Sequence, residues 1–198
     1  MGIYKYLKQA WKKPRETLGQ AYRQKLIQFR TEPVTLRIER PTRLNKARAL
    51  GYKPKLGVIL VRQKVLRGGH TRPKHAGGRR SKNMTHRMTL RRNYQAIAEA
   101  RANKQYKNCE VLNSYLAGED GKSYWYEIIL LDRDHPAVLA DRQYAGIAGQ
   151  RGRVYRGLTS AARKSRGLRR TGRGAEKMRP SRRQTVAIVR KGNRYGKY

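Results

Sequence analysis

The sequence is short of cysteine and has no long apolar run. Its 198 residues include a single cysteine, Cys109, which excludes an intramolecular disulfide framework and favours a reducing compartment. No apolar run approaches the roughly 18 to 20 residues that a membrane-spanning helix needs. The first residues, MGIYKYLKQAWKK, lack the apolar segment of a secretory signal. We therefore expect no membrane partner.

Acidic residues are missing over a long stretch. There is no carboxylate between Glu39 and Glu99, whereas seventeen Lys and Arg residues fall in that interval, eleven of them from Arg62 to Arg92. With no neighbouring opposite charge these groups repel one another, and four glycines and a proline disfavour a regular helix or strand. We predict that residues 62–92 form a flexible basic arm that becomes ordered against a polyanion. The alternative is a solvated loop without a partner.

The whole chain shows the same imbalance, with 49 Lys and Arg residues, 12 Asp and Glu residues and a formal net charge of +37. Such a charge disfavours an isolated compact state and favours a polyanion, either RNA or DNA. Residues 99–141 are the exception, because they carry five basic and eight acidic groups. We expect this block to face away from the polyanion.

Apolar periodicity in the first third predicts helix followed by strands. Residues 2–30 are predicted to be helical, with an interruption at the first proline and an apolar stripe that belongs to the core. Alternation of apolar and polar residues predicts strands at 34–38 and 55–66. Between them we expect a short helix that Thr42 caps and Gly51 ends.

The strongest β signal comes later in the chain. Two runs, at about 110–116 and 123–131, are joined by a short Gly-containing connection, which predicts an antiparallel hairpin. Both faces of the second run are apolar, so that strand is expected to be central and covered by helices. Helices are predicted before it, at 93–107, and after it, around Pro136.

These elements predict an α+β fold with a small, mostly antiparallel sheet, packed helices and long basic extensions. We assign a globular domain to residues 1–141, interrupted by the arm at about 62–92, and a basic C-terminal extension to residues 142–198.

Regular structure is expected to fade after Asp141. Within the extension, Leu158–Leu168 is predicted to be a short basic helix with Thr159 or Ser160 as its N-cap. The last apolar patch, Thr185–Val189, is expected to add one strand or to pack locally.

No catalytic constellation is recognisable. The histidines of the arm, His70, His75 and His86, have no thiolate or carboxylate nearby to complete a zinc site, so we interpret them as donors or stacking planes. Five carboxylates, Glu119, Asp120, Asp132, Asp134 and Asp141, fall at turns or near helix ends, where local hydrogen bonds explain them. Phosphate-loop, dinucleotide and nucleophile-elbow motifs are missing. We expect no catalytic residue, metal, cofactor or small-molecule substrate.

Basic residues on long irregular segments indicate RNA rather than a DNA groove read by one helix. Arginine can hold phosphate in a bidentate fork or stack on a base, and Tyr144, Tyr155, Tyr195 and Tyr198 are candidates for stacking. The predicted RNA-binding residues are Arg40, Arg43, Lys46, Arg48, Lys53, Lys55, Arg67, Gly68, Gly69, His70, Arg72, Lys74, His75, Arg79, Arg80, Lys82, Arg87, Arg91, Arg92, Arg151, Arg153, Arg156, Arg163, Lys164, Arg166, Arg169, Arg170 and Arg173.

Five blocks of sequence resemble a known family. They are MGIYKY at 1–6, RPTRLNKARALGYKPKLG at 40–57, RGGHTRP at 67–73, VLNSYLAGED at 111–120 and RGLTSAARKSRGL at 156–168. On these blocks the chain resembles the L15e family of archaeal and eukaryotic-type large-subunit ribosomal proteins, and the tail GRGAEKMRP is closer to the archaeal form. The resemblance implies a small α/β domain with extensions buried in large-subunit ribosomal RNA, beside neighbouring ribosomal proteins in the cytoplasmic ribosome. It also implies no catalysis.

The resulting hypothesis is a structural component of the large ribosomal subunit that stabilises RNA by neutralising phosphates and ordering its basic segments. One alternative is a DNA-compacting architectural protein, which would bind duplexes with little sequence preference. Another is an RNA-modifying enzyme, which would need a pocket with converging functional groups.

Overall fold

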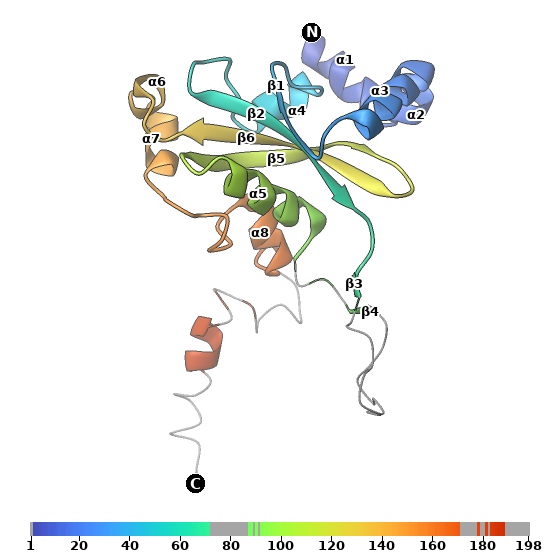
Figure 1. The fold of residues 1–198 in the computed structure, drawn as a ribbon. Helices are drawn as coiled ribbons and strands as arrows, with labels where there is room; N and C mark the ends of the chain where they lie inside the picture. Colours follow the sequence, from blue (N-terminus) through green and yellow to red (C-terminus); the bar gives the residue numbers. More distant parts are fainter. Residues whose placement is uncertain are drawn as a thin grey trace, which may run out of the picture.

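The computed structural model describes residues 2–71, 87–88, 90, 92–170, 178, 181 and 183–188, and these confirm the predicted α+β class. A four-stranded antiparallel sheet has the strand order β1-β2-β6-β5 and lies between two groups of helices (Figure 1). Its strands are β1 (Thr35–Ile38), β2 (Val58–Leu66), β5 (Cys109–Glu119) and β6 (Ser123–Asp132).

The predicted hairpin is formed by β5 and β6, and β6 is internal because it pairs with β2 on its other side. Alternate residues of β6 enter different clusters: Ile128 and Leu130 belong to one, whereas Ile129 and Leu131 face the opposite side. All four side chains are fully buried. The apolar character of both faces therefore reflects a strand that is covered on both sides, as the sequence indicates.

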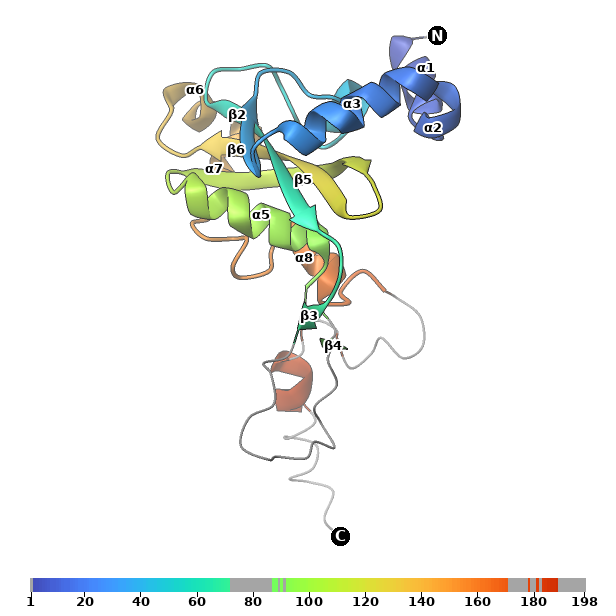
Figure 2. The same cartoon turned by 45° about the vertical axis from the view of Figure 1, so that its right-hand side comes forward.

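One face of the sheet is covered by α5 (Tyr94–Gln105), which the views in Figures 1 and 2 place beside α8 (Ser160–Ser165). Asn93 caps α5, since its side chain accepts a hydrogen bond from the backbone N–H of Ala96. Ala98 and Ala102 are fully buried and pack against the sheet. These small side chains allow the helix to approach the strands closely.

The other face carries the N-terminal helices and two short ones. Their bounds are α1 (Ile3–Ala10), α2 (Pro14–Thr17), α3 (Gly19–Thr31), α4 (Leu44–Ala49) and α6 (Pro136–Leu139). The predicted stripe is confirmed by the burial of Tyr22, Leu26 and Phe29 against Trp125 of β6. The helix after the first proline is not continuous, because Gly19 has a φ of 45° and separates α2 from α3.

Thr42 does not cap α4, which is a correction of the prediction. Arg43 occupies the cap position, and the Thr42 hydroxyl donates instead to the Glu127 carboxylate across the sheet. Gly51 follows the last turn of α4 with a φ of 97°, a conformation that favours glycine, so the predicted stop is confirmed.

A buried polar network lies between α3 and the sheet. Arg62 is in β2, and its guanidinium bonds Glu32 at 2.6 Å and Glu127 at 3.2 Å while lying 3.9 Å from the centre of the Phe29 ring. Tyr115 donates to Glu127 at 2.6 Å, and burial together with this carboxylate raises the pKa of Tyr115. Arg62 is therefore an internal cation and no part of a free arm.

The irregular chain begins only after Leu66, because residues 62–66 belong to β2. Two short strands, β3 (His70–Thr71) and β4 (Arg87–Met88), pair with each other beyond the end of the sheet. The predicted flexibility of the arm at 72–86 lies outside the described residues.

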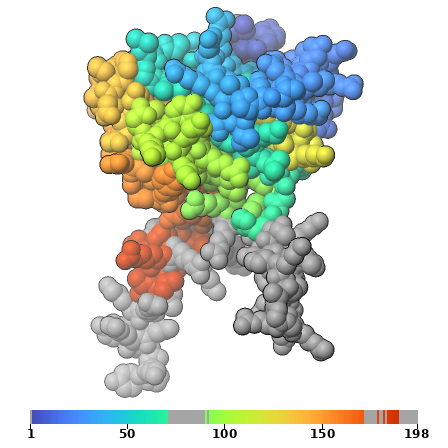
Figure 3. All heavy atoms as spheres, viewed as in Figure 1, coloured from blue at the N-terminus to red at the C-terminus, as the bar shows by residue number. Residues whose placement is uncertain are grey.

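Order does not fade after Asp141, and that prediction is wrong for residues 142–170. Here the chain forms α7 (Arg142–Ala148), with Tyr144 buried against Leu131, and then α8 (Ser160–Ser165) with Thr159 as its N-cap. This segment adjoins α5 at the surface in Figure 3. Residues 183–188 are helical, so of the two alternatives for Thr185–Val189 the strand is wrong, and local packing stays a prediction.

Replacing Gly118 by alanine is expected to lower the free energy of unfolding by about 1 to 3 kcal/mol, as overpacking does. A Cβ atom at Gly118 would lie 2.9 Å from the Leu26 side chain and 3.4 Å from the Phe29 ring. Urea titration measures the loss. Gly121→Ala is the matched control, because a Cβ there has nothing within 4 Å. Equal stability of the two variants would contradict the tight α3–β5 contact.

Candidate nucleic-acid interface

A basic groove runs between the end of β2 and the first turns of α5. It has a volume of about 720 Å³ and no acidic lining residue; it is lined by Val65, Leu66, Arg67, Gly68, Gly69, His70, Leu90, Arg92, Tyr94, Ile97 and Arg101. The floor is largely apolar, whereas Arg67, Arg92 and Arg101 are exposed cations. A floor of this kind with cations at its edge can hold bases and phosphates together.

Gly68, which follows β2, is hydrogen-bonded to Tyr94 at the start of α5, so the two ends of the arm are held together there. The Tyr94 hydroxyl accepts a hydrogen bond from the Gly68 N–H at 2.8 Å and donates to the Gly68 carbonyl at 3.0 Å. Arg67 lies 4.8 Å from the centre of the Tyr124 ring and donates to the Asp120 carbonyl at 2.9 Å. These contacts hold the base of the arm against the folded body.

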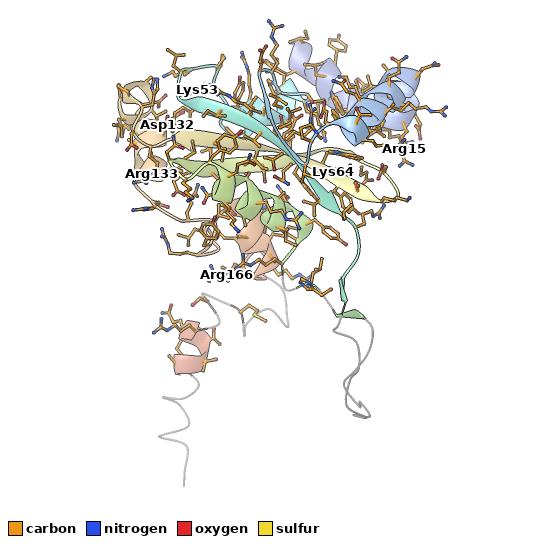
Figure 4. All side chains as sticks on the ribbon, viewed as in Figure 1. Arg15, Lys53, Lys64, Asp132, Arg133 and Arg166 are labelled. Atoms are coloured by element: carbon orange, nitrogen blue, oxygen red, sulfur yellow. The ribbon has the colours of Figure 1, made fainter. Side chains whose placement is uncertain are left out.

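A second cavity, of about 190 Å³, adjoins the first through Arg92. It lies where α5, α8 and the turns at 151–157 meet, and it is lined by Arg92, Ala96, Val154, Tyr155, Arg156, Gly157, Ala162, Ser165 and Arg166. None of these nine residues is acidic. The label of Arg166 in Figure 4 locates this side of the molecule.

Buried Glu99 fixes α8 to the sheet. Its carboxylate accepts hydrogen bonds from the hydroxyls of Ser114, at 2.5 Å, and Thr159, at 2.6 Å. Thr159 in turn caps α8 through the N–H of Ala162. Burial raises the pKa of Glu99, although both hydrogen bonds and Arg153 act in the opposite direction. One side chain therefore joins α5, β5 and the start of α8.

The variant Glu99→Gln is expected to flatten the dependence of stability on pH above about 4.5, the ordinary pKa of this group. Because the pKa is raised in the folded state, folding favours the protonated acid, so the contribution of Glu99 is fully present below its unfolded pKa and is lost as pH rises through the folded pKa. The amide carries no charge and can accept only one of the two hydroxyl hydrogen bonds, because its NH2 group is a donor. Thermal unfolding of wild type and variant from pH 4 to 8 measures the difference, and parallel curves would contradict it. Glu16→Gln, at an exposed site, is the control.

The turns at 151–157 are anchored by a second buried acid. Glu110 accepts a hydrogen bond from the Gly152 N–H at 2.6 Å. Arg153 donates to the carbonyl of Val111 at 2.8 Å, and burial lowers its pKa. The wall of the smaller cavity is thus attached to the edge strand β5.

A third group of basic residues lies around α4, on the other side of the sheet. Arg43 is partly committed there, because it donates to the Leu116 carbonyl and lies over the Trp11 ring. Lys53 and Lys55 both contact Asp141, at 3.0 and 2.9 Å. These two lysines and the Gln143 N–H hold the pKa of Asp141 well below its usual range.

The structure sorts the predicted RNA-binding residues into three sets. The exposed ones are Arg40, Lys46, Arg48, Lys55, Arg67, Gly68, Gly69, His70, Arg92, Arg151, Arg156, Arg163, Lys164, Arg166, Arg169 and Arg170. Arg43, Lys53 and Arg153 are half-buried. Outside the described residues, or described without a side chain, are Arg72, Lys74, His75, Arg79, Arg80, Lys82, Arg87, Arg91 and Arg173.

Arg101 is the functional candidate that the sequence argument missed. It follows Tyr94 and Ile97 at positions seven and four residues later, so the three side chains share one face of α5 and line the groove. The helical spacing of these three residues can be read from the sequence. However, the pattern assigns Tyr94 and Ile97 to the core, and Arg101 lies in the near-neutral block 99–141, so neither feature indicates a binding residue.

Tyr144 is not available for stacking on a base, which corrects the prediction. It is buried, and its hydroxyl donates to the Gly51 carbonyl at 2.6 Å. Tyr155 is half exposed and lines the smaller cavity. Tyr195 and Tyr198 lie outside the described residues.

Two observations concern other kinds of site. In the described part of the chain, no three His, Cys, Asp or Glu side chains gather where they could hold a metal ion. No described helix is both long enough and apolar enough to cross a membrane.

Asp120 and Asp141 accept local backbone N–H bonds in a turn and at a helix cap, which confirms the structural interpretation of these carboxylates.

Comparisons with known proteins agree with the sequence blocks. The family model for L15e, described as Ribosomal L15, matches residues 2–185. Three archaeal relatives are each described as large ribosomal subunit protein eL15. That of Methanocella arvoryzae is 48% identical over 90% of this chain and 93% of its own length. Those of Nanoarchaeum equitans and Methanocorpusculum labreanum are 49% identical over 92% and 90% of this chain and 97% and 93% of their own.

Proposed function

The chain belongs to the L15e family of ribosomal proteins, and from this membership we propose that it is a structural component of the large ribosomal subunit, in the cytoplasm, bound to ribosomal RNA and to neighbouring large-subunit proteins. The observation that carries the proposal is that the groove and the smaller cavity, which share Arg92, have basic and no acidic residues among the described residues that line them. Two such concave sites on a chain of net charge +37 suit a polyanion with unpaired bases.

The proposed mechanism is neutralisation of phosphates with release of counterions. The exposed arginines around Arg92 contact the RNA backbone, and we propose that the arm at 72–86 and the basic chain after Arg170 lie in the grooves and junctions of the RNA. The body formed by the sheet holds these segments at fixed points, because Tyr94 clamps one and Glu99 the other. Folded RNA is thereby held in one arrangement.

Two other functions are less well supported. A DNA-compacting protein would need a surface that follows a duplex, whereas the groove and cavity are concave and partly apolar. An RNA-modifying enzyme would need an acid, base or nucleophile in the pocket, and neither cavity has an acidic lining residue. We therefore propose that the chain has no catalytic role and no small-molecule substrate.

Sedimentation of a tagged full-length chain in an archaeal lysate tests the proposal. The chain is expected to travel with large subunits through a sucrose gradient, to be released by ribonuclease and to be unaffected by deoxyribonuclease. Release by deoxyribonuclease alone would support the DNA-compacting alternative. A chain that stays at the top of the gradient would contradict both.

A further inference from the structure

The smaller cavity is lined by apolar side chains, an aromatic ring and arginines. A site that binds only phosphate needs the arginines but neither of the other two. Ala96, Val154 and Ala162 are buried and provide an apolar floor. The ring of Tyr155, which is 51% exposed, forms one wall. Arg92 lines the cavity and is exposed, and among the described residues it has no hydrogen-bond or ion-pair partner.

Two further guanidinium groups at the rim are held in place by backbone carbonyls. Arg156 donates to the carbonyl of Arg151, and Arg166 donates to that of Gly157 at 3.1 Å. The Arg166 side chain packs over Gly157 so closely that a Cβ atom there would lie 2.8 Å from its Cδ. Each guanidinium has five donors, so one bond to a carbonyl positions the group and leaves the others for a ligand.

The size of the cavity limits what can enter. At about 190 Å³ it is smaller than the roughly 300 to 1,000 Å³ that encloses a drug-sized ligand. It is also concave, and a duplex, whose bases are stacked on one another, cannot present the face of a base to the apolar floor. A single planar ring with an attached phosphate matches an apolar floor, an aromatic wall and a cationic rim.

We propose that this cavity receives one unpaired RNA nucleotide, with its base against Tyr155 and the apolar floor and its phosphate among Arg92, Arg156 and Arg166. The inference rests on the proposed function, because it names the part of the RNA that one site recognises. A phosphate held without its base is the competing outcome.

Three small probes separate these outcomes on the full-length protein. Adenosine 5′-monophosphate carries base and phosphate, ribose 5-phosphate lacks the base, and adenosine lacks the phosphate. In NMR titrations the nucleotide is expected to shift the Tyr155 ring and the methyl groups of Ala96 and Ala162. Ribose 5-phosphate is expected to bind about 5- to 100-fold more weakly, the loss that one stacked base represents.

Variants locate the site. Tyr155→Ala is expected to weaken binding of the nucleotide by a similar factor and to leave ribose 5-phosphate unaffected. Gly157→Ala, which displaces Arg166, is expected to weaken both. Tyr6→Ala is the matched control, because Tyr6 is 63% exposed among basic residues of α1 and lies outside the cavity.

Equal binding of the nucleotide and ribose 5-phosphate would overturn the proposal, and so would shifts confined to other residues or no effect of Tyr155→Ala. Tyr155 is half exposed, so its removal leaves the core intact, and a one-dimensional spectrum checks folding. Failure of the nucleotide test with normal sedimentation on large subunits would reject this cavity and keep the ribosomal function. Failure of sedimentation would reject the function itself.

Discussion

Replacing Glu127 by alanine is expected to lower the free energy of unfolding by about 3 to 5 kcal/mol, the usual loss when one partner of a buried ion pair is removed. Glu127 is fully buried, and its carboxylate accepts hydrogen bonds from Arg62, Tyr115 and Thr42. Without it, Arg62 keeps only Glu32 as an anionic partner. The Tyr115 hydroxyl is left inside the protein without its acceptor.

Urea titration of the full-length chain measures this loss. Glu16→Ala is the control, because its ion pair with Lys13 is exposed and such pairs contribute about 0 to 1 kcal/mol. The double variant Arg62→Met with Glu127→Leu is expected to lose less than the sum of the single variants, because the contact between Arg62 and Glu127 is counted in both single losses and Glu32 loses its cation only once. A loss at Glu127 no larger than that at Glu16 would contradict the internal role of the network.

Replacing the three arginines of the groove together is expected to cause a large loss of affinity for RNA. The variant Arg67→Ala, Arg92→Ala, Arg101→Ala is expected to bind purified large-subunit ribosomal RNA about 100-fold more weakly at low salt, since each lost contact costs on the order of 1 kcal/mol or more. The slope of log affinity against log salt is expected to fall by about 2 to 3, because binding releases fewer counterions from the RNA for each phosphate contact that is lost.

A change of charge alone could weaken binding, so the control must carry the same change elsewhere. Lys12→Ala, Arg15→Ala, Arg23→Ala removes three exposed cations from the N-terminal helices, and Figure 4 shows Arg15 far from Arg166. This control is expected to reduce the affinity only slightly. If both triple variants lost affinity and slope equally, the groove would be no more than part of a uniformly charged surface.

The hairpin of β5 and β6 could be predicted because its signal is local. Alternating residues on both sides of a short Gly-containing connection determine the pairing. The register could not be predicted, because β5 shifts between Val111 and Asn113 and again between Leu116 and Gly118. Each shift places an extra residue in one strand, and an uninterrupted apolar pattern does not reveal it.

Which charged side chains are buried, and which groups they contact, could not be predicted, because their partners are distant in sequence. Arg62 meets Glu32 and Glu127 across 30 and 65 residues, and Glu99 meets Thr159 across 60. Counting charges along the chain predicts only that residues 99–141 face away from the polyanion, and it does not distinguish exposed acids from buried ones. Glu99, Glu110 and Glu127 of this block are buried, where they join separate elements.

The same long-range contacts explain why order continues beyond Asp141. The apolar residues of 142–170 are few and spaced by glycines, so periodicity alone predicts little structure there. Thr159 and Gly152 of this segment are held in place by hydrogen bonds to Glu99 and Glu110, which belong to α5 and β5. A local sequence signal could identify the cap of α8 but not the surface against which α8 packs.

The hydrogen bonds between Gly68 and Tyr94 also have a consequence for stability: the free energy of folding is expected to depend only weakly on the length of the arm. Gly68 and Tyr94 are joined by two hydrogen bonds, so the chain between them starts and ends at one place on the body. For a flexible loop closed in this way, the entropic cost grows only with the logarithm of its length, by about 0.6 kcal/mol for each doubling. Insertions and deletions between Gly68 and Tyr94 are therefore expected to change the free energy of folding only slightly.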